Sequence, residues 1–406
     1  MWETVRKFGL EHCDLPTMMW NVALMLRGLT LNIYTRYEKG IPSVFYITTS
    51  LLAACYLYTY FISMIWFVFV RCLQTRDLTA AMIVFSLGIT SEIGAAKFIN
   101  AYFYRRKICN LVQEYLDYDS SIASIRFTGN LLRVLRVVKR RALFYVIVIV
   151  CNGIVYIFKP MVMPGRNAIE DIFILYKLEP EFETPNYELS YFLSAAGTFL
   201  TCYLALSMAA FLVIAAGYVE AQLLALSKEL VNLWTDVERK YLENFERHDD
   251  KTQDRYDAIN KDIEARLKNI VTGHTKTISL LYQLEDIFRP AFAFEFLILS
   301  VGLIAELLGG LENTYMQIPF ATIQVGMDCL TGQRVIDASL VFENAVYSCN
   351  WERFDASNMR VVLVMLINSQ RSLKLSAGGI AVLSFVTLMS VLKSVYSAFT
   401  TLQSVV

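Results

Sequence analysis

The sequence predicts an all-α polytopic membrane protein with seven transmembrane helices, because its hydrophobic residues are both numerous and gathered in blocks. Of the 406 residues, 56% are hydrophobic and only 18% are charged. A helix needs about 20 apolar residues to cross the hydrocarbon core of a bilayer, and several blocks of this chain reach that length. A third observation concerns charge: the segments between the blocks differ in sign, which predicts how the chain is oriented.

The first four spans are expected within residues 41–219. Residues 1–40 form a polar, amphipathic segment without the apolar core or cleavage site of a signal peptide, so we expect it to stay in the cytoplasm and the first span to direct insertion. An outer loop is expected at residues 164–188, between the third and fourth spans. The four expected spans are 41–70, 78–104, 142–163 and 189–219.

The second half of the chain alternates between charged and apolar segments. Residues 220–277 carry nearly balanced charges at helical spacing, which predicts cytoplasmic helical extensions. These extensions either only keep the chain soluble or bundle several subunits together. The segments expected after them are two spans within residues 278–331 (near 278–308 and 313–330), a cytoplasmic anchor helix at 332–375 and a seventh span at 376–406.

The charges of two connecting segments predict the orientation. Residues 105–141 are rich in Arg and Lys, whereas the outer loop at 164–188 carries six acidic and two basic side chains. Basic segments stay on the cytoplasmic side of membranes. With seven spans, the N-terminus is then cytoplasmic and the C-terminus extracellular, which is the reverse of a G-protein-coupled receptor.

Known catalytic and metal-binding patterns are missing from the sequence. The three His residues are not spaced for a metal or a general base, and no phosphate-binding loop, G-x-S-x-G or H-E-x-x-H motif occurs. The eight Cys residues form no C-x-x-C pair, and we interpret them as small buried side chains. The net charge is zero, with no basic patch for nucleic acid. We therefore expect neither an enzyme nor a cofactor, metal or nucleic-acid partner.

The last apolar segment carries its hydroxyl residues on a single face. They recur at steps of three and four, which is the spacing of one stripe along a helix. Lys393 lies beside this stripe at mid-membrane depth, where water or a partner must reach it. Packing against another helix and the lining of an aqueous pore both remain open interpretations. The stripe residues are Thr387, Ser390, Ser394, Ser397, Thr401 and Ser404.

A ligand cavity is expected in the outer halves of the second to sixth spans, where aromatic and polar side chains occur at similar depth. An apolar cleft with a few polar groups suits a small volatile organic molecule. Ordinary packing between helices is the alternative for each residue. In the second span, Glu92 and Lys97 are expected to lie close enough to pair around one turn. The candidate ligand-binding residues are Met82, Phe85, Asn152, Tyr156, Phe158, Leu200 and Tyr315.

The C-terminal residues resemble those of the insect odorant receptors. That family has a small-residue turn, a Ser, an A-x-Y-x-x-x-W pattern, a K-P-L-x-L-like step before an Ala-Gly pair, and a Y-S-x-F-x-x-L ending. Ser372 stands where the family has a proline. The outer loop is also similar, and length and topology extend the resemblance over the whole chain. The matching residues are Pro180, Pro185, Tyr187-Glu188-Leu189, Gly332, Ser339, Ala345, Tyr347, Trp351, Arg371 to Leu375, Ala377-Gly378, Tyr396-Ser397, Phe399 and Leu402.

The resemblance implies an odorant-gated, non-selective cation channel in the plasma membrane of a sensory neuron dendrite, surrounded by membrane lipid. It implies four subunits, a central pore lined by the last helix, and an obligate odorant receptor co-receptor as partner in a heterotetramer. This chain resembles a tuning subunit because it lacks the long cytoplasmic insertion of that co-receptor. The pore and gate residues carried over are Ser394, Ser397, Thr401, Leu402, Ser404 and Val405.

Three other functions remain as alternatives. A metabotropic seven-helix receptor conflicts with the predicted orientation. A gustatory-type receptor channel has a similar fold but usually ends in a T-Y-x-x-x-x-x-Q-F pattern. A transporter predicts paired halves with internal repeats or broken helices, and the sequence contains neither.

Overall fold

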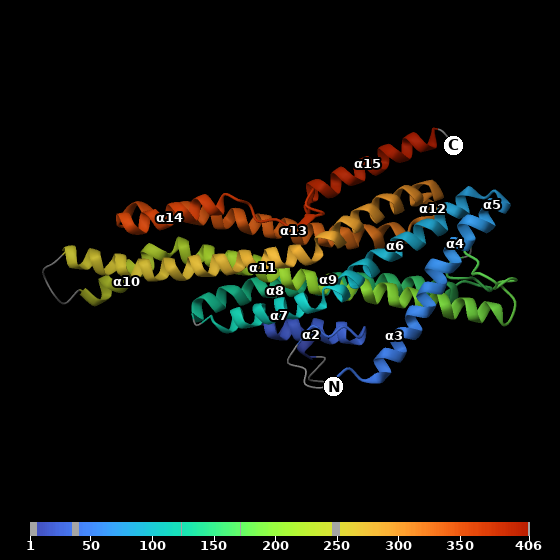
Figure 1. The fold of residues 1–406 in the computed structure, drawn as a ribbon, viewed down its shortest axis with the longest axis horizontal. Coiled ribbons are helices and arrows are strands. Elements are labelled where there is room, and N and C mark those ends of the chain that lie inside the picture. Colours follow the sequence, from blue (N-terminus) through green and yellow to red (C-terminus); the bar gives the residue numbers. More distant parts are fainter. Residues whose placement is uncertain (1–5, 35–39, 123, 171, 246–251, 405–406) are drawn as a thin grey trace.

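The protein forms an elongated bundle of long helices in a computed structural model (Figure 1). The structure describes residues 6–34, 40–122, 124–170, 172–245 and 252–404, and it describes the side chains of these residues except 242–245 and 252–254. The elements of the first half, in chain order, are α2 (Leu15–Gly28), α3 (Ser43–Tyr56), the π-helical η1 (Leu57–Ser63), α4 (Met64–Trp66), the π-helical η2 (Phe67–Arg71), α5 (Cys72–Thr75), α6 (Leu78–Phe103), α7 (Arg105–Ser120) and α8 (Ile125–Val162).

The second half contains the longest helices and one very short hairpin. Its elements are α9 (Asn186–Val231), α10 (Leu233–Phe245), α11 (Thr252–Gly309), α12 (Leu311–Thr314), α13 (Gln317–Tyr347), the 3₁₀ turn η3 (Trp351–Arg353), α14 (Ala356–Ser369), the strands β1 (Ser376–Ala377) and β2 (Ala381–Val382), and α15 (Phe385–Gln403).

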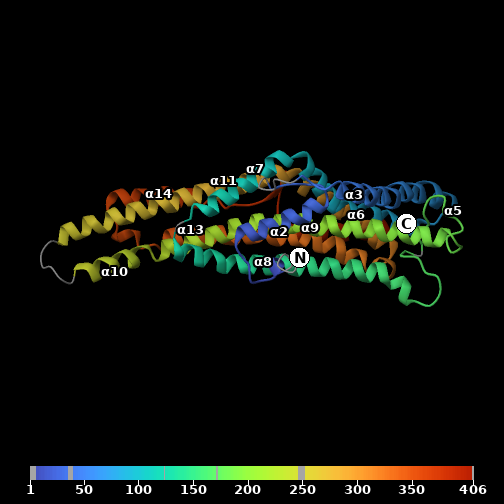
Figure 2. The same ribbon diagram turned by 90° about the horizontal axis from the view of Figure 1, so that it is seen from below.

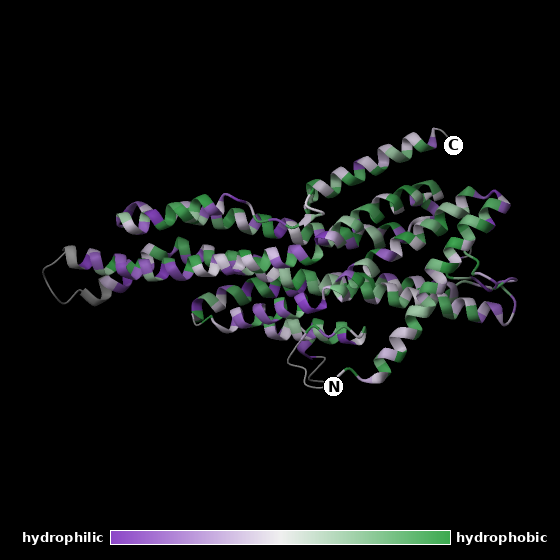
Figure 3. Ribbon diagram, in the orientation of Figure 1, coloured by the Kyte–Doolittle hydropathy of each residue, from purple (hydrophilic) through white to green (hydrophobic). Residues whose placement is uncertain are grey.

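Six helical stretches within the described residues are long and apolar enough to cross a membrane. The expected sixth span falls on the start of α13, which is not among the six and carries Gln317, Gln324 and Asp328 in this region. Hydrophobic residues dominate one half of the bundle, and hydrophilic residues gather at the opposite end around α10 and the start of α11 (Figure 3). The six stretches are Ser43–Thr75, Leu78–Phe103, Ile125–Val162, Asn186–Val231, Arg255–Gly309 and Phe385–Gln403.

α9 lies at the centre of the bundle. Its most apolar stretch is 89% buried, and it packs extensively against α8 and α13 and also contacts α3, α6 and α11. With 46 residues at about 1.5 Å each, α9 is roughly 69 Å long, more than twice the thickness of a bilayer core of about 30 Å. The apolar half and the hydrophilic half are therefore joined by continuous helices (Figure 2).

The segment before the first span is fastened to the N-terminal half of α8. The ammonium group of Lys139 is 4% exposed and donates hydrogen bonds to three backbone carbonyls, at 3.0 Å to Lys7, 2.6 Å to Gly9 and to His12. Asp14 then caps α2 by accepting a hydrogen bond from the Thr17 amide at 3.0 Å. These contacts hold α2 against α7 and α9.

A tight hairpin separates α14 from α15. Gly378 and Gly379 connect β1 to β2 with φ angles of +62° and +77°, which glycine adopts without strain. The Gly378 amide also donates to the carbonyl of Arg289 in α11 at 3.0 Å. Beyond this hairpin, α15 departs from the bundle and ends toward the side where α5 and α12 lie (Figure 1).

Candidate functional site

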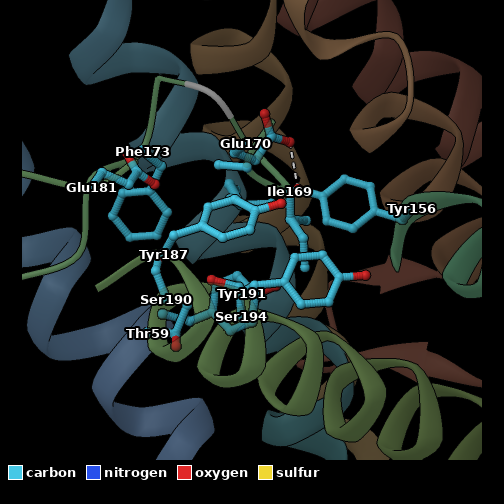
Figure 4. A pocket seen from close by; sticks show the side chains of 13 residues that line it. Thr59, Tyr156, Ile169, Glu170, Phe173, Glu181, Tyr187, Ser190, Tyr191 and Ser194 are labelled. Carbon is cyan, nitrogen blue, oxygen red and sulfur yellow. Dashed lines mark hydrogen bonds between the residues drawn. The ribbon is translucent and has the colours of Figure 1, made fainter. Parts of the chain in front are cut away.

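Two adjoining cavities lie between η1, α6, α8 and α9, and the start of α13 also lines the second one. We call the first the loop-side cavity, because residues of the loop between α8 and α9 line it together with residues of η1, α6, α8 and α9. Its lining residues are Thr59, Tyr60, Leu87, Tyr156, Ala168, Ile169, Glu170, Phe173, Glu181, Tyr187, Ser190, Tyr191 and Ser194 (Figure 4).

The second, which we call the deep cavity, lies farther along α9 from the loop. Thr198 in its wall is 12 residues beyond the first residue of α9, or roughly 18 Å along the helix axis. The two cavities share Tyr60, Leu87 and Tyr156 in their walls. The lining residues of the deep cavity are Tyr60, Leu87, Thr90, Ser91, Asn152, Tyr156, Thr198, Thr201, Cys202, Met316, Gln317 and Phe320.

A chain of hydrogen bonds connects the elements around both cavities. The Ser86 hydroxyl of α6 lies 2.8 Å from the Ile83 carbonyl and 3.0 Å from the amide oxygen of Gln317 at the start of α13, so these two acceptors share its proton. The Gln317 amide nitrogen donates to Glu170 of the loop at 3.1 Å. The hydroxyl of Tyr156 on α8 also donates to Glu170 (Figure 4). Glu170 thus ties the loop to α8 and α13, and the Gln317 amide extends this connection to α6.

Aromatic contacts hold the same loop on the first span. The rings of Phe67 and Phe173 meet edge to face with centroids 5.7 Å apart, and those of Trp66 and Tyr176 with centroids 5.3 Å apart. Phe173 is buried in the same apolar cluster as Tyr60 and Tyr156. The loop therefore forms a packed cover over the loop-side cavity.

The structure places the seven candidate ligand-binding residues in three different settings. Asn152 and Tyr156 line the deep cavity, and Tyr156 lines both cavities. Leu200 is buried in the apolar cluster around the cavities, Phe85 packs against that cluster, and Met82 is half-buried on α6. Phe158 and Tyr315 are more than half exposed and lie outside both linings, with the Lys159 ammonium 5.3 Å from the Tyr315 ring.

Sequence reasoning did not identify most of the cavity wall. Thr198 and Thr201 are spaced by three within an apolar span, and this hydroxyl spacing was a usable signal. Glu170 had no such signal, because its position depends on how the outer loop folds back onto the helices. Gln317 was likewise missed, although an amide at the start of an expected span is unusual enough to note.

A buried ionic cluster lies below the deep cavity. Lys97 of α6 donates to Glu295 of α11 at 2.7 Å and to Asp328 of α13, and all three side chains are at most 3% exposed. The expectation that Lys97 pairs with Glu92 around one turn is therefore wrong. The partners of Lys97 are 198 and 231 residues away in sequence, so local spacing could not reveal them. This cluster, which we call the Lys97 triad, clamps α6 to α11 and α13.

The last helix turns its hydroxyl stripe away from the rest of the chain. Only 11% of the apolar stretch of α15 is buried, and it contacts α11 and α13 through Leu388 and Val395. Ser394, Ser397, Thr401, Leu402 and Ser404 are exposed, and Val405 lies outside the described residues. Ser390 is also exposed and Thr387 is half-buried, so within the described chain the stripe from Ser390 onward is not covered by another helix.

No group of three or more His, Cys, Asp or Glu side chains within the described residues could hold a metal ion. The eight Cys residues are all free thiols.

Comparison with known protein families gives one match over most of the chain. The model of the 7tm odorant receptor family matches residues 77–396, which is more than three quarters of the sequence. The match begins at the residue that caps α6 and ends within α15. It includes every residue that lines the deep cavity except Tyr60.

Two proteins of Drosophila melanogaster are similar to shorter parts of the chain. Odorant receptor 13a is 28% identical over 161 residues, and Putative odorant receptor 85d is 27% identical over 146 residues. Each match covers 34% of this chain, and the two cover 38% and 35% of the respective relatives. The chain thus matches less than half the length of these relatives.

Two solved structures have the same fold over nearly the whole chain. The insect olfactory receptor OR5 from Machilis hrabei in complex with eugenol gives a TM-score of 0.73 at 13% identity, covering 97% of this chain and 99% of that one. A second structure of the same receptor gives a TM-score of 0.71 at 12% identity, with the same coverage. At these identities the likeness concerns the fold.

Proposed function

Because the chain belongs to the 7tm odorant receptor family of insects, we propose that it is a subunit of an odorant-gated, non-selective cation channel. A small volatile molecule binds in the loop-side and deep cavities, and a central pore lined by α15 then opens. The pore forms around the axis of a heterotetramer with the odorant receptor co-receptor. The complex resides in the plasma membrane of a sensory neuron dendrite.

One observation carries this proposal. α15 buries Leu388 and Val395 against α11 and α13, while its hydroxyl residues from Ser390 onward remain exposed on the opposite side. A hydroxylated face on a membrane helix needs water or a polar partner. A ring of such faces from several subunits supplies an aqueous path, and the apolar faces attach each α15 to its own subunit.

The Lys97 triad provides a route from the cavities to the pore. On α6, Lys97 lies six residues beyond Ser91, or about 9 Å along the axis. On α13, Asp328 lies eight residues beyond Phe320, or about 12 Å. The triad thus clamps together two cavity walls and α11, against which α15 packs. A ligand that fits better when these helices separate shifts α15 outward, and only such differential binding opens the pore.

The gate belongs to the outer end of α15. The family resemblance carries it to Thr401 and Leu402, with Ser404 and Val405 just beyond. The Thr401 hydroxyl donates to the backbone carbonyl of Ser397 at 2.9 Å, so its proton is used within the helix and its methyl group remains available at the constriction. A constriction of this kind closes by excluding water from a narrow apolar ring.

The proposed orientation of the chain in the membrane rests on the residues where α6 meets α7. Six consecutive exposed residues, 102–107, consist of three aromatic and then three basic side chains. Aromatic residues favour the interface of a membrane, and basic residues favour its cytoplasmic side. This pattern supports an orientation with the α6–α7 junction at the inner surface, the cavities in the outer half and the N-terminus in the cytoplasm.

Current recordings test the proposal. The chain is expressed with the co-receptor, without it, and with the co-receptor under G-protein blockade, and odour-evoked conductance is measured. We expect cation current with the co-receptor that survives the blockade. Current abolished by the blockade would instead indicate a metabotropic receptor, and an N-terminal tag accessible from outside the cell would support that result.

A further inference from the structure

The hydroxyl groups of the deep cavity use their protons within the protein. Four of its lining residues are Ser or Thr, and each hydroxyl donates its single proton to a backbone carbonyl one turn earlier in its own helix. A carbonyl oxygen only accepts, so the direction of each bond is fixed. The bonds run from Thr90 to Ser86 (2.8 Å), from Ser91 to Gly88 (2.7 Å), from Thr198 to Ser194 (2.9 Å) and from Thr201 to Gly197 (3.0 Å).

The hydroxyl protons of the two tyrosines in the deep cavity are also used in hydrogen bonds within the protein. The oxygens of Tyr60 and Thr198 are 2.8 Å apart, and since the Thr198 proton is already used, Tyr60 is the donor. Tyr156 donates to the carboxylate of Glu170. All six hydroxyl groups thus keep lone pairs that can accept, but none keeps a proton for a ligand.

One amide in the cavity is uncommitted. Gln317 uses its oxygen for Ser86 and its nitrogen for Glu170. Asn152 lines the same cavity and forms no hydrogen bond with any residue that the structure describes. It can therefore offer a ligand both an N–H donor and a carbonyl acceptor.

Charged ligands do not suit this cavity. Its lining contains no Asp, Glu, Lys, Arg or His among the described residues. Moving an ammonium or a carboxylate away from water without a charged partner is strongly unfavourable. Volatile amines in their cationic form and carboxylic acids in their anionic form are therefore poor ligands, and neutral molecules remain.

We propose that the deep cavity selects small, largely apolar molecules that carry one hydroxyl group, namely alcohols and phenols. The ligand hydroxyl donates to a Ser or Thr oxygen and accepts from the Asn152 amide. A ketone, aldehyde or ether of the same skeleton can only accept, so it leaves the surplus acceptors of the wall without a donor. This inference rests on the proposed function, because it assigns a ligand class to the same site.

Matched ligand series test the proposal. The chain is expressed with the co-receptor, and concentration–response curves are recorded for benzyl alcohol, benzyl methyl ether and benzaldehyde, and for cyclohexanol, methoxycyclohexane and cyclohexanone. The series is extended to further alcohol, ether and carbonyl triplets until one skeleton evokes current. We expect the alcohol to have an EC50 roughly three- to tenfold below its ether and carbonyl analogues, the effect of one net hydrogen bond.

Two substitutions in the deep cavity and one matched control test whether its lining causes this difference in EC50. Ser91→Ala and Thr201→Val each remove an acceptor with little change in shape, and together they should bring the ratio of ether to alcohol EC50 close to one. Ser207→Ala is the control, because Ser207 is buried in α9 and bonds the Tyr203 carbonyl at 2.8 Å but lies outside both cavities. It should leave the ratio unchanged.

Failure of the inference differs from failure of the proposed function. Equal or greater potency of the ether or carbonyl analogue, or an unchanged ratio in the Ser91→Ala/Thr201→Val double variant, overturns the assignment to alcohols and phenols while the channel function stands. Absence of current with every volatile, despite surface expression with the co-receptor, overturns the channel function itself.

Discussion

The Lys97 ammonium is surrounded by two carboxylates in a site that water does not reach. Asp328 and Glu295 outnumber the single cation, and one oxygen of Asp328 has no hydrogen-bond partner within the described chain. Removing one partner of a buried ion pair costs much stability, because it leaves the other charge unpaired. Removing one of two acids that share a single cation costs less, because the remaining acid is still paired. We therefore expect the loss of stability to differ between substitution of the cation and substitution of either acid.

Replacing the cation should destabilise the protein strongly. Lys97→Met leaves two buried carboxylates together, and the expected loss is about 3–5 kcal/mol of unfolding free energy. Glu295→Gln keeps the Lys97–Asp328 pair and should cost less. Thermal unfolding of the detergent-purified complex measures both. Lys107→Met is the control, because Lys107 and Asp286 pair at 2.9 Å on the surface and the substitution should leave the Tm unchanged. A Lys97→Met protein as stable as this control would contradict the prediction.

Asp119 gives a prediction about pH. Burial raises the pKa of this α7 carboxyl above its ordinary value of 3.8, although the Tyr218 hydroxyl, bonded at 3.2 Å, opposes the shift. The folded state then holds the proton to higher pH than the unfolded state, so the unfolding free energy falls as pH rises through this window. Asp119→Asn keeps an acceptor for Tyr218 but cannot ionise. We expect its Tm to exceed that of the wild type at neutral pH and the difference to vanish toward pH 3.8. A difference independent of pH would contradict this.

At the scale of the elements, one face of α15 packs against α11 and α13, and its other face is exposed. Thr401 lies on the hydroxyl stripe, whereas Tyr396 is 63% exposed but lies off the stripe, about 100° around the helix from Ser397. Thr401→Trp should reduce odour-evoked conductance severalfold and change ion selectivity, because it fills the constriction. Tyr396→Trp should affect neither. Single-channel recordings compare the two, and equal conductance in both variants would remove Thr401 from the pore.

The elements also indicate what sequence patterns can predict. Blocks of apolar residues mark the spans because only helices satisfy their backbone in lipid, and the expected span 78–104 nearly coincides with α6. Sequence patterns do not show that α8, α9 and α11 each continue from an apolar span into a charged segment, because amphipathic and fully apolar patterns meet within one helix. The lining of the cavities depends on tertiary contacts that local sequence patterns do not show. Glu170, for example, bonds to Gln317, which is 147 residues away in the sequence.

At the scale of the whole molecule, one apolar surface lies beyond the expected membrane. Leu363, Val364 and Ile367 of α14 are each more than half exposed, in the segment expected to be cytoplasmic. Lipid cannot cover them there, and contiguous apolar surface of this kind marks a protein interface. We therefore expect neighbouring subunits to cover this face in the complex.

A charge on this surface should impair assembly. Ile367→Asp places a carboxylate where burial is expected, so recovery of the complex by co-purification with the co-receptor should fall severalfold. Asn269→Asp introduces the same group on the exposed part of α11 and serves as the matched control, with normal recovery expected. Equal recovery of both variants would show that the α14 surface takes no part in assembly.

The unbroken length of α9 has a mechanical consequence. A rod that crosses the bilayer and continues beyond it can tilt but cannot shorten, so a thinner hydrocarbon layer must incline it or deform the surrounding lipid. Inclination at one end displaces the far end, and α8 and α13 move with it. The same odour should then evoke different open probabilities in vesicles whose lipids differ only in acyl-chain length, which makes the bilayer itself a regulator of sensitivity.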